Sequence, residues 1–177
     1  FDIAILNLFL NKSFDFKGLF SGKGLISDLY RSPKVFFDIT GDSVEVFRNP
    51  VGTLKMMSRW DDNNKHLNVL AKSYLKGKPH FTALGYYVPD STYLNLSASL
   101  DELSVSYFEP FLSDLISKSS GKLSGELFLQ GPLDKLALTG KDCRFDDFAF
   151  TLDYTNVPYR INGPVELNER GIFFNKL

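Results

Sequence analysis

The hydrophobic residues of this chain recur at every second position over most of its length. Leu94, Leu96, Ala98 and Leu100, for example, alternate with polar residues. A period of two places alternate side chains on opposite faces of a β-strand. The same alternation recurs around residues 44–46, 54–60, 67–71, 81–87 and 148–154, and turn-forming stretches such as "DDNN" (61–64) and "LKGKP" (75–79) separate the runs. No helical segments are interleaved, so the pattern predicts an all-β, mostly antiparallel sheet.

One segment departs from this alternation. In "FEPFLSDLISKSSG" the residues Phe111, Leu112, Leu115 and Ile116 share one helical face, with a proline near the first turn and a glycine after the end. This spacing predicts a short amphipathic helix from near Glu109 to Ser117. Its expected role is to cap an apolar sheet end, and a role in gating a groove is the less favoured alternative.

Several glycines lie in phase with the apolar residues rather than with the polar ones. Glycine weakens a strand interior, so its presence there indicates a bend or a close approach of two backbones. Small residues on the apolar face suit a sheet that curls toward that face, whereas isolated bulges explain any single glycine equally well. Because the phase repeats, we favour curvature. The predicted curvature glycines are Gly22, Gly85, Gly125, Gly131, Gly140 and Gly163.

Composition narrows the class of protein. The chain has 177 residues, a net charge of −1 and no basic run, which disfavours a nucleic-acid surface. No uninterrupted apolar run reaches the roughly 18 residues that a membrane span needs, and the opening "FDIAILNLFL" lacks the features of a signal peptide. Cys143 is the one cysteine, so no intrachain disulfide is expected. We expect a single β-domain over residues 1–177, excised from a longer protein.

The sequence offers no catalytic or metal-binding pattern. The two histidines, His66 and His80, have no cysteine or carboxylate at ligand spacing, and "DDNN" and "DDF" lack the spaced oxygens of a calcium loop. "SGKG" (21–24) lacks the spacing of a phosphate loop, and no Gly-x-Ser-x-Gly elbow occurs. We therefore expect a protein that is not an enzyme and has no metal or cofactor.

The order of elements in the C-terminal half resembles the TamB family of the AsmA-like group. Residues 103–153 run from a short helix through Gly-x-Leu-x-Gly-x-Leu-x-Leu-x-Gly, a proline-containing turn and Leu-x-Leu-x-Gly. Residues 20–47 echo the same motif, which indicates two weak repeat units, about 14–117 and 121–177, the second truncated. Asp28 stands where the second unit has Gly131.

The resemblance implies a fold, a place and a role. TamB-like proteins are anchored in the inner membrane of Gram-negative bacteria and cross the periplasm as an elongated, curled "β-taco" sheet with an apolar concave groove. The family is associated with phospholipid transport and, with an outer-membrane partner of the Omp85 type, with the assembly and secretion of outer-membrane proteins. The resemblance therefore implies that the groove shields phospholipid acyl chains or nascent outer-membrane strands. The candidate lining residues follow from the apolar phase: Phe81, Leu94, Leu96, Leu123, Leu127, Leu129, Leu136, Leu138, Phe148, Phe150, Leu152, Tyr154, Ile161 and Val165.

Two other classes share the same alternation. One is a closed β-barrel or sandwich that binds a small apolar ligand. The other is a structural or adhesive β-module whose apolar face is fully packed and dry. The alternation of the sequence does not distinguish them, so the accessibility of the apolar face is the deciding observation.

Overall fold

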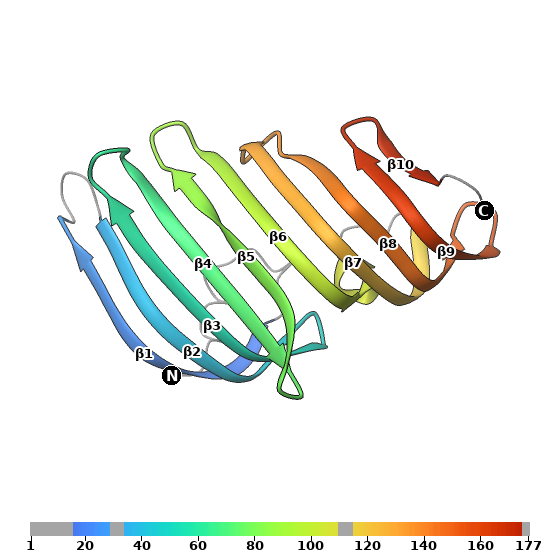
Figure 1. Cartoon of the computed structure of the whole chain (residues 1–177), viewed down its shortest axis with the longest axis horizontal. Coiled ribbons are helices and arrows are strands. Elements are labelled where there is room, and N and C mark those ends of the chain that lie inside the picture. Colours follow the sequence, from blue (N-terminus) through green and yellow to red (C-terminus); the bar gives the residue numbers. More distant parts are fainter. Residues whose placement is uncertain (1–15, 29–33, 110–114, 175–177) are drawn as a thin grey trace. The chain divides into compact units, whose positions relative to one another are not determined.

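The computed structural model describes residues 16–28, 34–109 and 115–174, and almost all of them lie in strands. Each strand pairs with its neighbours in sequence, so the sheet order is the chain order, as Figure 1 shows. In the described residues β1 and β10 are not neighbours, so the sheet is open. The strands are β1 (Phe16–Ser27), β2 (Lys34–Val46), β3 (Asn49–Asp61), β4 (His66–Leu75), β5 (Lys78–Val88), β6 (Tyr93–Ser104), β7 (Ile116–Pro132), β8 (Ala137–Leu152), β9 (Val157–Asn168) and β10 (Gly171–Phe174). The predicted all-β, antiparallel class is confirmed.

Short polar turns connect the strands where the sequence predicts them. Between β3 and β4, the Asp61 Oδ1 atom accepts hydrogen bonds from the backbone N–H groups of Asn63 and Asn64, at 2.8 and 3.1 Å. This side-chain mimicry of a backbone turn explains why "DDNN" reverses the chain. The next turn places Gly77 at φ +78°, a conformation that costs glycine little.

The predicted helix lies mostly on residues 110–114, outside the described residues. Before them, Val105–Phe108 form a single 3-10 turn, and Glu109 has helical backbone angles. The predicted end at Ser117 is wrong, because β7 already begins at Ile116. Two contacts hold the chain extended here: the Asp153 N–H donates to the Leu115 carbonyl at 3.1 Å, and the Ser117 hydroxyl donates to the Asp153 carboxylate at 2.5 Å.

The residues group into two compact units. Unit 1 comprises the described residues up to Ala98 together with Phe128–Ala137, and unit 2 comprises Ser99–Leu127 and the described residues from Leu138 onward. Each unit has its own buried apolar residues. Those of unit 1 are Phe20, Val44, Val51 and Leu54; those of unit 2 are Leu100, Leu103, Val105, Leu123, Leu127, Cys143, Phe145, Phe148, Ile161, Val165 and Leu167.

Bulges shift the alternation of the strands at two pairs of polar residues. In β2 the pairing with β3 slips between Gly41 and Val44, and in β8 the pairing with β9 slips between Phe145 and Phe148. At both places two polar residues separate two residues of the same face. The second polar residue takes a positive φ, +51° at Ser43 and +55° at Asp147, and polar side chains adopt this region more readily than β-branched ones.

Candidate functional site

The pairing register of unit 1 assembles one continuous apolar face. Residues directly opposite each other in an antiparallel pair project to the same side of the sheet. Phe37 lies opposite Ser58, Ser58 opposite Val69, and Val69 opposite Gly85. Parallel rows follow the same path across the strands and contain Phe20, Gly22, Ile39, Gly41, Leu54, Met56, Ala71, Ser73, Phe81 and Ala83.

Two serines of this face are fully buried and bind the backbone. The Ser73 hydroxyl donates to the Val51 carbonyl at 2.6 Å, and the Ser58 hydroxyl accepts from the Phe37 N–H at 3.2 Å. Both are almost inaccessible to solvent. Because each hydroxyl has a backbone partner, these serines tie neighbouring strands together without leaving an unsatisfied polar group on the apolar face.

In unit 2 the apolar face is dominated by stacked rings. Phe145 and Phe148 stack with ring centroids 4.4 Å apart, Phe148 and Phe150 at 4.8 Å, and Phe150 and Tyr159 at 5.5 Å. We call these four residues the aromatic row. The bulge in β8 brings Phe145 and Phe148 onto one face, so the row depends on the two aspartates between them.

Solvent exposure rises along the aromatic row toward the β8–β9 turn. Phe145 and Phe148 are buried and Phe150 is half-buried, whereas Tyr159 is 44% exposed. Val157, opposite Leu152 at the end of the pair, is 41% exposed. The apolar face of unit 2 is therefore open to solvent at the end of strands β8 and β9.

Most of the predicted lining residues lie within strands and are at least partly buried. In unit 2, Leu123, Leu127, Phe148, Ile161 and Val165 are buried. Leu138 in unit 2 is exposed. The remaining strand residues of the prediction are half-buried: Phe81, Leu94, Leu96 and Leu129 in unit 1, and Phe150 and Leu152 in unit 2.

Two predicted lining residues lie outside the strands. Tyr154 is in the turn after β8 and is 97% exposed, and Leu136 immediately precedes β8. The alternation from Phe148 to Leu152 does not extend to Tyr154, because the chain turns after Leu152. Phe145 was missed as a member of the face. The two polar residues of "FDDF" were the available signal, since they mark the bulge.

The predicted curvature glycines fall into three groups. An added Cβ at Gly22, Gly85, Gly125 or Gly131 would lie within 2.9 Å of the backbone of an adjacent strand or turn. At Gly140 it would meet the Cys143 sulfur at 2.7 Å and the Leu167 Cδ1 at 2.9 Å, which is side-chain crowding. At Gly163 nothing lies within 4 Å. At Gly140 a side chain would therefore be crowded by other side chains of the apolar face. At the four glycines of the first group it would collide with the backbone of the neighbouring strand or turn.

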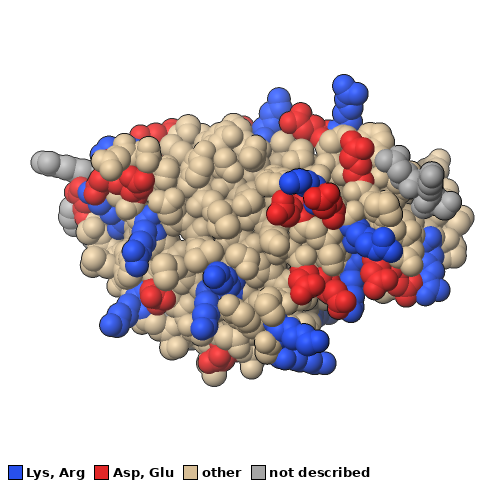
Figure 2. Space-filling view, viewed as in Figure 1, with Lys and Arg blue, Asp and Glu red and all other residues tan. Residues whose placement is uncertain are grey.

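Charged groups lie at the bulges and on the opposite face. At the β8 bulge, Arg160 pairs with Asp147 and keeps the pKa of that carboxyl below its usual value. Lys122 pairs with Glu102 at 2.6 Å. On the face seen in Figure 2, basic side chains are interspersed with acidic ones.

The described residues provide little for acid–base or metal chemistry. Among them no group of three or more His, Cys, Asp or Glu residues is arranged to hold a metal ion. Burial raises the pKa of the Cys143 thiol, which keeps it protonated, and burial raises the pKa of Tyr107 to about 12. No helix within the described part of the chain is long and apolar enough to cross a bilayer.

Comparison with protein-family models, with curated proteins and with solved structures finds no match to this chain.

Proposed function

We propose that this chain is a non-enzymatic segment of a cell-envelope protein whose apolar sheet face shields lipid acyl chains. The observation that carries the proposal is the aromatic row, which is buried at Phe145 and open to solvent at Tyr159. A fully packed structural module would not leave large apolar side chains accessible at one end of its core face.

The energetics of the face suit an acyl chain. Each buried methylene is worth about 0.8 kcal/mol, so a chain of about 16 carbons gains on the order of 10 kcal/mol when fully covered. A surface of this kind needs no head-group pocket, and the absence of a polar cluster among the described face residues is consistent with it. The open sheet argues against a closed barrel around a small ligand.

The resemblance to the TamB family supports the wider setting of the proposal. In that setting the segment belongs to a longer protein anchored in the inner membrane, crosses the periplasm and works with an outer-membrane partner of the Omp85 type. Nascent outer-membrane strands are the competing cargo. We favour lipid because the exposed feature is a surface of stacked rings, which covers methylenes without needing backbone partners.

Photocrosslinking tests the proposal directly. Leu138→Asp and Phe150→Arg each place a charge on the apolar face, and an isolated charge beside an acyl chain is costly. Both variants should lose crosslinking to a phosphatidylethanolamine with a photoactivatable acyl chain. Phe173→Arg is the matched control, because Phe173 lies opposite Glu166 on the other face of the sheet. If the parent chain does not crosslink, or the folded Phe150→Arg variant crosslinks like the control, the proposal is wrong.

A further inference from the structure

The polar face of unit 1 carries a band of apolar side chains. On the face that holds Lys55 and Lys72, Met57 lies opposite Leu70, and Leu70 lies opposite Leu84. On the same face of the first two strands, Leu25 lies opposite Phe36. We call Leu25, Phe36, Met57, Leu70 and Leu84 the polar-face band, which crosses strands β1 to β5 in unit 1.

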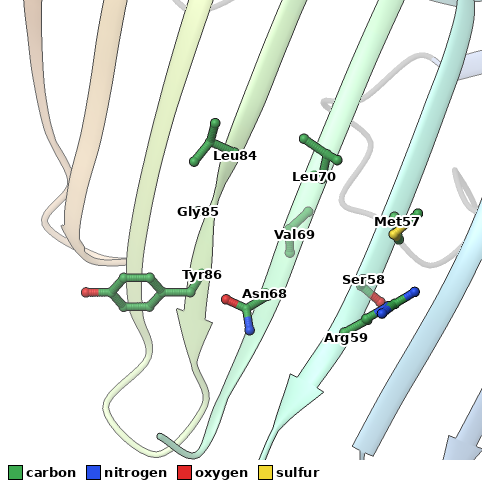
Figure 3. A pocket seen from close by; sticks show the side chains of 9 residues that line it. All are labelled: Met57, Ser58, Arg59, Asn68, Val69, Leu70, Leu84, Gly85 and Tyr86. Carbon is green, nitrogen blue, oxygen red and sulfur yellow. The ribbon is translucent and has the colours of Figure 1, made fainter.

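The polar-face band is accessible and contains two depressions. Leu25 is 61% exposed and Leu84 is 54% exposed. Figure 3 shows Leu84, Leu70 and Met57 in one row and Tyr86, Asn68 and Arg59 in the next; a depression of about 420 Å³ lies along them. A second depression of about 290 Å³ is lined by Leu25 and Phe36. Arg59 lines both depressions and so lies between them.

Positive charge flanks the polar-face band on both sides. Lys55 lies directly opposite Lys72, and like charges in this position repel each other. Within the part of the chain that the structure describes, neither lysine nor Arg59 forms an ion pair with a carboxylate. Two carboxylates also lie here, and each has a lysine beside it. Asp38 lies opposite Met57 and opposite Lys23, and Asp62 lines the second depression and pairs with Lys34. The repulsion between Lys55 in β3 and Lys72 in β4 is unfavourable, and an external anion bound beside them would reduce it.

We propose that the polar-face band binds an acidic amphipathic helix of a partner protein. Four strand spacings of about 4.8 Å give a band about 19 Å long, which about 13 helical residues would cover. An apolar stripe would insert into the two depressions, and flanking carboxylates would reach Lys55, Lys72 and Arg59. Depressions suit inserted side chains better than a flat bilayer surface, so a helix is favoured over an anionic membrane. The polar-face band is separate from the proposed lipid-binding surface, because the band and the apolar face of unit 1 project to opposite sides of strands β1 to β5.

Binding of a model helix to the whole chain tests this inference. The probe is a fluorescent helix of about 18 residues with leucines along one face and glutamates beside them. It should bind saturably, and a helix with lysine in place of every glutamate should bind about tenfold more weakly at low salt. A scrambled acidic peptide of the same composition should also bind weakly, because its leucines do not form a stripe.

Single substitutions locate the site and separate it from the lipid-binding face. Leu84→Ser, Leu25→Ser and Arg59→Gln change exposed side chains, and each should weaken the acidic helix about fivefold or more. Phe150→Arg should leave helix binding unchanged while it abolishes lipid crosslinking. The inference is overturned if the acidic helix does not bind, if the lysine helix binds equally, or if all three band variants bind normally. It is also overturned if phosphatidylglycerol vesicles bind through the same three residues and displace the helix.

Discussion

The strand pairs β1–β2 and β7–β8 bend their backbones with the same combination of residues. In β1, Gly18 has φ +144° and packs against Val44; in β7, Gly125 has φ +132° and packs against Cys143. Val44 and Cys143 are both buried, and each comes after a glycine and a two-residue polar insertion, in "TGDSV" and "TGKDC". The two pairs therefore share one local arrangement, in which a glycine in one strand faces a bulge in the next.

The two pairs differ in how closely the strands approach and in the path of the chain after the bulge. An added Cβ would lie 3.2 Å from the Val44 Cα at Gly18 but 2.7 Å from the Cys143 Cα at Gly125. In β8 the pairing with β9 shifts between Phe145 and Phe148 and brings Phe148 onto the apolar face. In β2 a second shift in the pairing with β3 follows directly between Val44 and Glu45, and the strand ends at Val46. Both pairs share a glycine that faces a bulge, and the shift between Phe145 and Phe148 adds the aromatic row in β8.

Removal of the central ring of the aromatic row should have the largest effect. Phe148 is buried between Phe145 and Phe150, so Phe148→Ala leaves a cavity and should destabilise unit 2 by about 3–5 kcal/mol. Hydrogen exchange of backbone amides in β8 and β9 should report this loss, while amides of β2 and β3 should change little. Phe36→Ala, on the polar face of unit 1, is the matched control. Equal exchange changes in both units would show that they do not unfold separately.

The closer approach at Gly125 predicts a larger cost for a side chain there than at Gly18. Gly125→Val adds overpacking to a strained φ and should cost about 3 kcal/mol. Gly18→Val should cost less stability, because the atom nearest to an added Cβ is 3.1 Å away at Gly18 and 2.7 Å away at Gly125. Gly163→Val separates the two causes, since Gly163 has φ +124° but nothing within 4 Å. The measurement is the denaturation midpoint of each variant; if Gly163→Val costs as much as Gly125→Val, strand crowding is not the cause.

Much of the fold could be predicted from alternation, because a half-buried sheet imposes a period of two on every strand. The turns were predictable as well, since Asp61 carries its own hydrogen-bonding signal. The bulges were not, because a polar pair inside a strand reads as an interruption of the pattern, although it keeps Phe145 and Phe148 on one face. The polar-face band was not predictable either, because only the pairing register shows that residues such as Leu70 and Leu84 lie side by side.

The bulge residues with positive φ offer a smaller test of the shared bend. Asp142 in unit 2 has φ +52°, close to the +51° of Ser43 in unit 1. Asp142→Gly should be neutral or stabilise by up to about 1 kcal/mol, because glycine tolerates this conformation, whereas Asp142→Val should cost about 2 kcal/mol. Ser43→Gly and Ser43→Val should give the same ordering. Thermal unfolding measures all four, and a valine variant as stable as its glycine counterpart would contradict the assigned backbone conformation.

The exposed ion pairs should contribute the smallest effect, and a similar one in both units. Arg160 lowers the pKa of Asp147 in unit 2, and Lys34, 2.5 Å from Asp62, lowers the pKa of that carboxyl in unit 1. A carboxyl with a lowered folded-state pKa stabilises the fold above its unfolded pKa, near 3.8, and loses that contribution as the pH falls through the lower folded value. The Arg160–Asp147 pair is exposed, and in the other pair Asp62 is exposed and Lys34 is half-buried, so salt should screen both pairs. Arg160→Gln and Lys34→Gln should therefore each slightly reduce the drop in midpoint between pH 5 and pH 2 at low salt, and neither should matter at 1 M salt. A large drop that survives in both variants would assign the acid sensitivity to other carboxyls, such as Asp61, whose pKa is lowered by hydrogen bonds from Asn64 and Asn63.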